Sequence, residues 1–202
     1  MVKSTRILIP AAAELSPYIQ GHVSSLCGLY AVLNAIQLAL WPHRKLTRAQ
    51  LKKLFMHGVE HLDKVGILKS VLQHGIDEQS WLVLCATSIK RAHQLTDINL
   101  RCTFPIRRVQ QLTRRRALAA IKLQLRMGRP VLVTLLGGYD HVTVVVGYDH
   151  KKLTLFDSSG FKWVAQTSMG LHHPSSTKRH QIRRSTVGTL FMGRVRQKSD
   201  VT

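Results

Sequence analysis

A cysteine followed by glycine stands at the start of an apolar stretch with helical periodicity. The segment reads Ser-Ser-Leu-Cys27-Gly28, and apolar residues recur every three or four positions between residues 29 and 40. A thiol at a helix N-terminus lies at the positive end of the helix dipole, which favours the reactive thiolate. We expect Gly28 to let the chain turn into this helix and to let a substrate approach closely. Cys27 is therefore a candidate nucleophile whose own N–H can bind an oxyanion; the alternative is a small residue packing a helix start.

A histidine and an aspartate lie at the two ends of a predicted β-hairpin. His141 opens an apolar stretch of strand type, and Asp157 closes the next such stretch after a short turn. If Gly147 pairs with Lys151, His141 faces Asp157 directly, whereas a slip of one residue would move Asp157 to the other face. The imidazole would then be a general base oriented by the carboxylate. The alternatives are a solvent-facing histidine at a strand end and an aspartate that only begins a turn.

Cysteine at a helix start, then histidine and an acid on a following sheet, is an order that suits acyl transfer. Gln20, seven residues before Cys27, could add an amide donor for the oxyanion. These residues, with Gly-Arg-Pro-Val-Leu-Val at 128–133 and Gly-x-x-His-Val-x-Val-Val-x-Gly-Tyr at 138–148, resemble the papain-like superfamily of cysteine peptidases. Within it, the chain is most similar to the bacterial peptidases that process double-glycine leaders of bacteriocins.

The resemblance spans residues 20–160 and implies a role for each site residue. Cys27 would be the nucleophile, His141 the general base and then acid, Asp157 the orienting carboxylate and Gln20 the oxyanion donor. The implied activity is hydrolysis of a peptide or isopeptide bond through a thioester acyl-enzyme, without a cofactor. The same residues could instead transfer the acyl group or deamidate glutamine.

The elements that must position these residues follow an α+β order, with helices first and an antiparallel sheet after them. We expect one papain-like domain over residues 1–202, in which the nucleophile helix packs on the sheet. Its parts are an N-terminal arm or strand (1–19), a helical half (20–127) and a sheet half (128–202). Helices are predicted at 29–40, 47–62, 67–73 and 114–127, strands at 7–9, 81–85, 131–136, 141–148, 153–157 and 187–195, and a long loop at 169–184.

The charge of the chain is its most unusual compositional property. Lys and Arg number 30 against 10 Asp and Glu, a net charge of +20, and basic residues concentrate at 101–129 and 178–184. Such a surface attracts nucleic acid, acidic protein or anionic lipid. We expect it to bring an acidic protein or peptide substrate to the site. The competing hypothesis is a nucleic-acid-binding module whose cysteine and histidine are not catalytic.

Other classes of protein are excluded or disfavoured by composition. A hydrophobic fraction of 45% argues against a disordered tail, and no apolar run reaches the roughly 18 residues of a membrane span. Three cysteines are too few for a disulfide scaffold, which favours the cytoplasm, or delivery as an effector without a cleavable signal. His57 and His61 have metal-capable spacing, but Gly58 stands where zinc peptidases of the His-Glu-x-x-His type carry glutamate, so no metal is expected.

Overall fold

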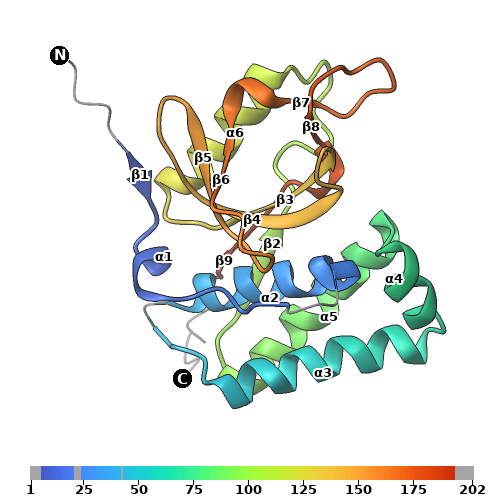
Figure 1. Cartoon of the computed structure of the whole chain (residues 1–202). Coiled ribbons are helices and arrows are strands. Elements are labelled where there is room, and N and C mark those ends of the chain that lie inside the picture. The colour runs from blue at the N-terminus through green and yellow to red at the C-terminus, as the bar shows by residue number, and fades with distance from the viewer. Residues whose placement is uncertain (1–5, 21–23, 42, 194–202) are drawn as a thin grey trace, which may run out of the picture.

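A layer of helices packs against a mainly antiparallel sheet in the computed structural model, which describes residues 6–20, 24–41 and 43–193 (Figure 1). The α+β prediction is therefore confirmed. One continuous hydrophobic core joins the two layers, and α2 lies at its centre. The helices are α1 (Ala11–Glu14), α2 (Cys27–Leu40), α3 (Arg48–Lys64), α4 (Leu68–His74), α5 (Glu78–Thr96) and α6 (Arg114–Arg126).

Helix α2 is buried along its whole length because it has neighbours on every side. It packs on α3 and α5 in the helical layer, and on β3, β4 and β9 of the sheet. Its apolar residues satisfy both layers at once, and a helix that is hydrophobic all round is expected in such a position. The nucleophile candidate at its first residue is thus held between the two layers.

The described strands form one sheet in the order β2-β9-β3-β4-β5-β6. Strand β1 pairs with β4, and β8 pairs with β3 and, in parallel, with β7. The predicted arm strand at 7–9 is confirmed by β1. The strands are β1 (Ile7–Leu8), β2 (Leu100–Thr103), β3 (Val131–Gly137), β4 (His141–Tyr148), β5 (Lys152–Phe156), β6 (Trp163–Ala165), β7 (Met169–Leu171), β8 (His180–Ile182) and β9 (Gly188–Met192).

The pairing of β4 with β5 differs from the predicted register. Gly147 pairs with Thr154 and not with Lys151, and the register then shifts by one residue between Val145 and Gly147. Beyond this bulge Val144 pairs with Phe156, so the predicted pairing was wrong by two residues at the site. Because side chains alternate along a strand, an even displacement preserves the face. Asp157 consequently stays on the face of His141 even though it does not lie directly opposite.

Two segments were assigned wrongly from the sequence. The run at 81–85, predicted as a strand, lies inside α5, which begins after Asp77, whose side chain accepts a hydrogen bond from the Ser80 N–H at 3.0 Å. The segment 169–184, predicted as a loop, contains the short strands β7 and β8. In addition, β2 falls within the predicted helical half but pairs with β9 of the sheet, and the predicted last strand is observed as Gly188–Met192.

No helix in the described part of the chain combines the length and the apolar character that crossing a membrane requires.

Candidate active site

Cys27 is the first residue of α2 and lies at the wall of a cleft. A short 3-10 helix, Ser24–Leu26, leads into α2, and Leu26 at the N-cap provides no side-chain hydrogen bond to the first turn. The cleft has a volume of about 320 Å³, and its lining includes Cys27, Trp81, Thr134 and Asp140. The cysteine is buried, but it borders a space that a ligand can enter. This location fits the sequence-based expectation of a thiol at a helix start.

Gly28 serves a different purpose from the one predicted. It lies inside the helix without a positive φ, and a Cβ built on it would lie 2.8 Å from Ile76 and 3.0 Å from Trp81. The Trp81 indole N–H also donates a hydrogen bond to the Gly28 carbonyl at 3.2 Å. Glycine is therefore required here by the close packing of Ile76 and of Trp81, which is 1% exposed, against the first turn of α2.

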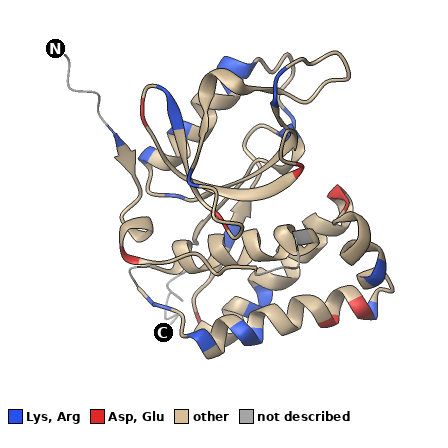
Figure 2. Cartoon of the chain, in the orientation of Figure 1, with Lys and Arg blue, Asp and Glu red and all other residues tan. Residues whose placement is uncertain are grey.

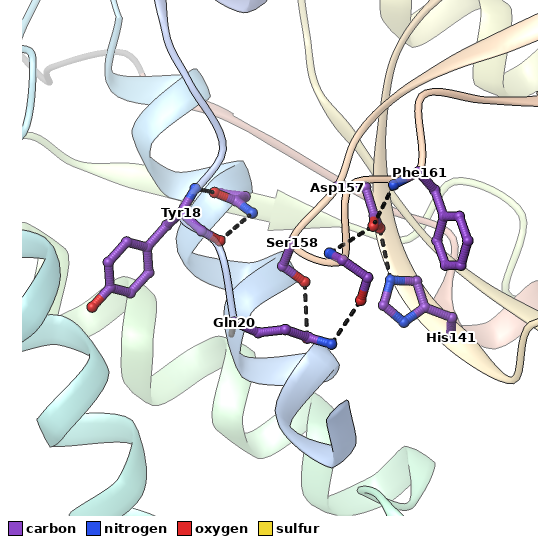
Figure 3. Close-up of polar contacts among 8 residues, drawn as sticks. Tyr18, Gln20, His141, Asp157, Ser158 and Phe161 are labelled. Carbon is purple, nitrogen blue, oxygen red and sulfur yellow. Dashed lines mark hydrogen bonds and ion pairs between the residues drawn. The ribbon is translucent and has the colours of Figure 1, made fainter. Parts of the chain in front are cut away.

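His141 and Asp157 form a buried pair. His141 Nε2 lies 2.7 Å from Asp157 Oδ2, and the two side chains are 7% and 0% exposed (Figure 3). Asp157 Oδ1 accepts hydrogen bonds from the backbone N–H groups of Ser159, at 2.8 Å, and Phe161, at 3.3 Å. The carboxylate is thus fixed by the turn that follows it, and both of its oxygens are used. Nδ1 is the ring nitrogen that remains for an exchange of protons with a thiol.

The electrostatics of the pair favour a charged imidazole. Burial alone would lower the pKa of His141, but hydrogen bonds to Asp157 and to the Cys27 sulfur, with the charges of both, raise that pKa to about 9. Burial alone would raise the pKa of Asp157, yet the hydrogen bond and the charge of His141 hold it below its ordinary value. The structure therefore brings Cys27, His141 and Asp157 together, with the imidazole between the other two.

Gln20 lies beside this group, attached to the turn after Asp157. Its Nε2 donates to Ser159 Oγ at 2.6 Å, and its Oε1 accepts from Ser158 Oγ at 3.0 Å (Figure 3). Its backbone N–H also donates to the Ser158 carbonyl at 3.2 Å. Gln20 is 7% exposed, so the amide is buried and held at both ends. One of its two N–H groups is committed to Ser159, which leaves one for another acceptor.

Two polar residues of α2 position the segment that carries Gln20, and sequence reasoning did not find this role. Asn34, fully buried, accepts from the Tyr18 N–H at 2.7 Å and donates to the Tyr18 carbonyl at 3.3 Å. Gln37 donates to Asn34 Oδ1 at 2.8 Å and to the Ser16 carbonyl at 3.3 Å. The available signal was the presence of two polar residues, three positions apart, in a helix otherwise composed of apolar residues.

An aromatic stack beside His141 was also missed. The Phe161 ring meets the imidazole edge-on, with centroids 5.6 Å apart, and stacks on Tyr139 at 4.4 Å. Tyr139 in turn contacts the His180 ring at 4.2 Å. These rings limit the orientations of the imidazole and cover one side of the acid–base pair. Tyr139 and Phe161 are dispersed in the sequence, so only the strand register could have associated them with the site.

The remaining candidate residues lie elsewhere. Neither His57 nor His61 belongs to a group of three potential ligands, and within the described ranges no such group of His, Cys, Asp and Glu is found. Burial raises the pKa of Cys102 to about 12 and places that of Cys85 well above its ordinary value. These two thiols are therefore in the unreactive form at neutral pH.

Comparison of the chain with models of protein families, with curated proteins and with solved structures gives no match.

Proposed function

We propose that this protein is a papain-like thiol hydrolase that cleaves a peptide or isopeptide bond through a thioester acyl-enzyme. The observation that carries the proposal is the buried 2.7 Å contact between His141 and Asp157, with the Cys27 sulfur contributing to the raised pKa of the same ring. A thiol, an imidazole and a carboxylate in this order form the arrangement that activates a nucleophile for acyl transfer.

The reaction follows from the charges of the resting site. At neutral pH, a histidine with a pKa of about 9 holds its proton, and the imidazolium is the group that would stabilise negative charge on the Cys27 sulfur during attack. The sulfur attacks the substrate carbonyl, and a C–S bond forms as the carbonyl oxygen becomes an oxyanion. The Cys27 N–H at the start of α2 and the second N–H of the Gln20 amide are the proposed donors to this oxygen.

Breakdown of this intermediate uses the proton on His141. The C–N bond breaks, and Nδ1 gives its proton to the departing amine, which leaves a thioester on Cys27. The neutral imidazole then takes a proton from water as the water attacks the thioester. The C–S bond breaks, the carboxylic acid product leaves, and the thiolate–imidazolium pair is restored. Asp157 keeps its charge throughout, because its hydrogen bond stabilises the imidazolium and orients the ring.

The first test compares the three thiols of one molecule. Iodoacetamide is added across a pH series, and the modified cysteine is identified by mass spectrometry of peptides. We expect Cys27, at the wall of the cleft, to be alkylated first, whereas Cys85 and Cys102, whose pKa values are raised by burial, should resist. His141→Ala should slow the labelling of Cys27 at neutral pH, and Cys102→Ala is the matched control that should leave it unchanged.

The second test measures acyl transfer and amide cleavage. With p-nitrophenyl acetate, we expect a burst of nitrophenolate and an acetyl group on Cys27, both lost in Cys27→Ala. A mixture of denatured cellular proteins should then gain new N-termini with the wild-type protein and none with Cys27→Ala. Equal cleavage by Cys27→Ala and the wild type would refute the proposal.

A further inference from the structure

The positive charge belongs mainly to the sheet half of the molecule. Residues 98–193 contain 16 Lys and Arg and three Asp, a net charge of +13, whereas the other described residues contain 10 Lys and Arg and six Asp and Glu, a net of +4. Figure 2 shows the basic residues recurring around the sheet, with acidic residues at few points. The charge is thus a property of one part of the fold.

The three aspartates of this half have local roles and do not neutralise the arginines. Asp157 binds His141, Asp149 accepts the N–H groups of the turn between β4 and β5, and Asp140 accepts the Gly137 N–H at 2.8 Å. Among the described residues, the one Lys or Arg within ion-pair distance of a carboxylate is Arg183, 3.9 Å from Glu78. The remaining basic side chains of this half therefore present a largely uncompensated charge to solvent.

The fold brings together the two basic stretches of the sequence. Helix α6 packs on β7, and the Arg114 guanidinium donates to the Gln166 carbonyl at 2.7 Å. Just before α6 lies a groove of about 500 Å³, with Arg184 and two histidines among apolar residues and a glutamine in its lining: Gln111, Leu112, Leu171, His172, His173, Ile182 and Arg184. Residues 111 and 112 line one wall and residues between 171 and 184 the other, although they are far apart in the chain. We call this the basic groove.

Three arginines at the start of α6 raise the positive potential beside the groove. Arg114, Arg115 and Arg116 occupy the first turn, are exposed, and have no acidic residue among them. Because the N-terminus of a helix already carries partial positive charge, cations in this turn destabilise the helix by a few tenths of a kcal/mol or more each. Their placement is therefore not explained by the stability of α6.

A second groove borders the same strands and adds aromatic surface. It measures about 510 Å³, and its lining includes Phe161, Trp163, Lys162 and Arg179. Phe161 is 37% exposed and Trp163 is 48% exposed. The Lys152 ammonium lies 3.8 Å from the centre of the Trp163 ring. Aromatic rings accompanied by cations are the combination on which unpaired bases stack.

From these observations we infer that the sheet half binds single-stranded nucleic acid, with phosphates along the basic groove and bases on the aromatic surface. Arg supplies 11 of the 16 cations, and the guanidinium binds phosphate in a bidentate manner. Stacking surfaces favour nucleic acid over an acidic protein, which would use only the charge. The inference does not depend on the proposed hydrolase activity, because neither groove is lined by Cys27, His141 or Asp157.

The test measures binding of a fluorescein-labelled RNA of about 20 nucleotides by anisotropy between roughly 50 and 300 mM KCl. The variant R114Q/R115Q/R116Q removes the three exposed arginines at the start of α6, and K52Q/K53Q/K64Q removes three lysines of α3 as the charge-matched control. We expect the first variant to bind on the order of tenfold more weakly, with a salt slope shallower by about 2, because each lost phosphate contact removes roughly 0.7 from the slope for single strands. The control should remain near wild type.

Several outcomes would overturn the inference: no binding near 50 mM KCl, an equal loss in both variants, or displacement of the RNA by polyglutamate as readily as by unlabelled RNA. Binding to anionic lipid vesicles without binding to RNA would also refute it. Should the arginine variant fail to fold by circular dichroism, R179Q/R184Q from the other basic stretch replaces it. Cys27→Ala should bind RNA like the wild type, so failure of the hydrolase proposal and failure of this inference are distinguishable.

Discussion

Asp157→Asn offers a quantitative test of the charges in the proposed triad. The substitution keeps the size of the side chain but removes the charge that sustains the imidazolium. In the native protein, the pKa of His141 is raised from 6.5 to about 9. One pKa unit corresponds to about 1.4 kcal/mol, so the raised value represents on the order of 3 kcal/mol of folding free energy. His141 is 6% exposed, so solvent screening of this interaction is small.

The direction of the pH dependence follows from linkage. A histidine whose pKa is higher in the folded state adds its full stabilisation below the unfolded value of 6.5, and loses it as the pH rises through about 9. The difference in unfolding free energy between wild type and Asp157→Asn should therefore be greatest near pH 6. It should shrink by up to about 3 kcal/mol by about pH 10, by the share of the raised pKa that Asp157 and not Cys27 supplies. Asp157 itself, whose pKa is lowered, stays ionised over this range.

The assay is urea unfolding followed by tryptophan fluorescence at several pH values between about 6 and 10. Asp149→Asn is the control, because this carboxylate lies at a surface turn and accepts the N–H groups of that turn. Its difference from wild type should not vary over the range. Cys27→Ala, measured in parallel, separates the part of the raised pKa that the sulfur contributes. A difference for Asp157→Asn that is constant from pH 6 to 10 would refute the electrostatic reasoning.

Two further substitutions test the supports of the site. Gly28→Ala should destabilise the protein by about 1–3 kcal/mol in urea unfolding, because the new Cβ would lie 2.8 Å from Ile76. Asn34→Ala should cost about 2–4 kcal/mol and also slow acetylation of the nucleophile, because it removes both hydrogen bonds to the Tyr18 backbone; unchanged acetylation would show that the segment is held without it.

The residues of the proposed triad could be chosen from the sequence because each rests on a local pattern. Helical periodicity places Cys27 at the start of α2, and alternation places His141 and Asp157 in a hairpin. The detailed pairing could not be predicted, since the turn and the bulge each changed the register without a clear signal in the sequence. The prediction that the two share a face survived because the combined displacement is even.

Contacts between distant segments account for most of what the sequence did not indicate. The run of apolar residues around Trp81 fits a strand or a buried helix, and only the packing against Gly28 distinguishes them. In the sequence, Asn34 is only a polar residue within a helix. Its role is evident only in the structure, where the Tyr18 backbone lies beside it. Likewise, composition reveals the basic stretches, but only the packing of α6 on β7 unites them beside a groove.

The attachment of Gln20 to the turn after Asp157 has a consequence for the order in which the chain folds. The His141–Asp157 contact joins residues 16 apart, whereas the contacts of Gln20 with Ser158 and Ser159 join residues 138 and 139 apart. Contacts between distant residues close large loops and are formed slowly. The His141–Asp157 pair can thus form within its hairpin while the Gln20 amide is still unplaced. During synthesis from the N-terminus, Cys27 is made long before His141, so the two residues come together only after the sheet has folded onto α2.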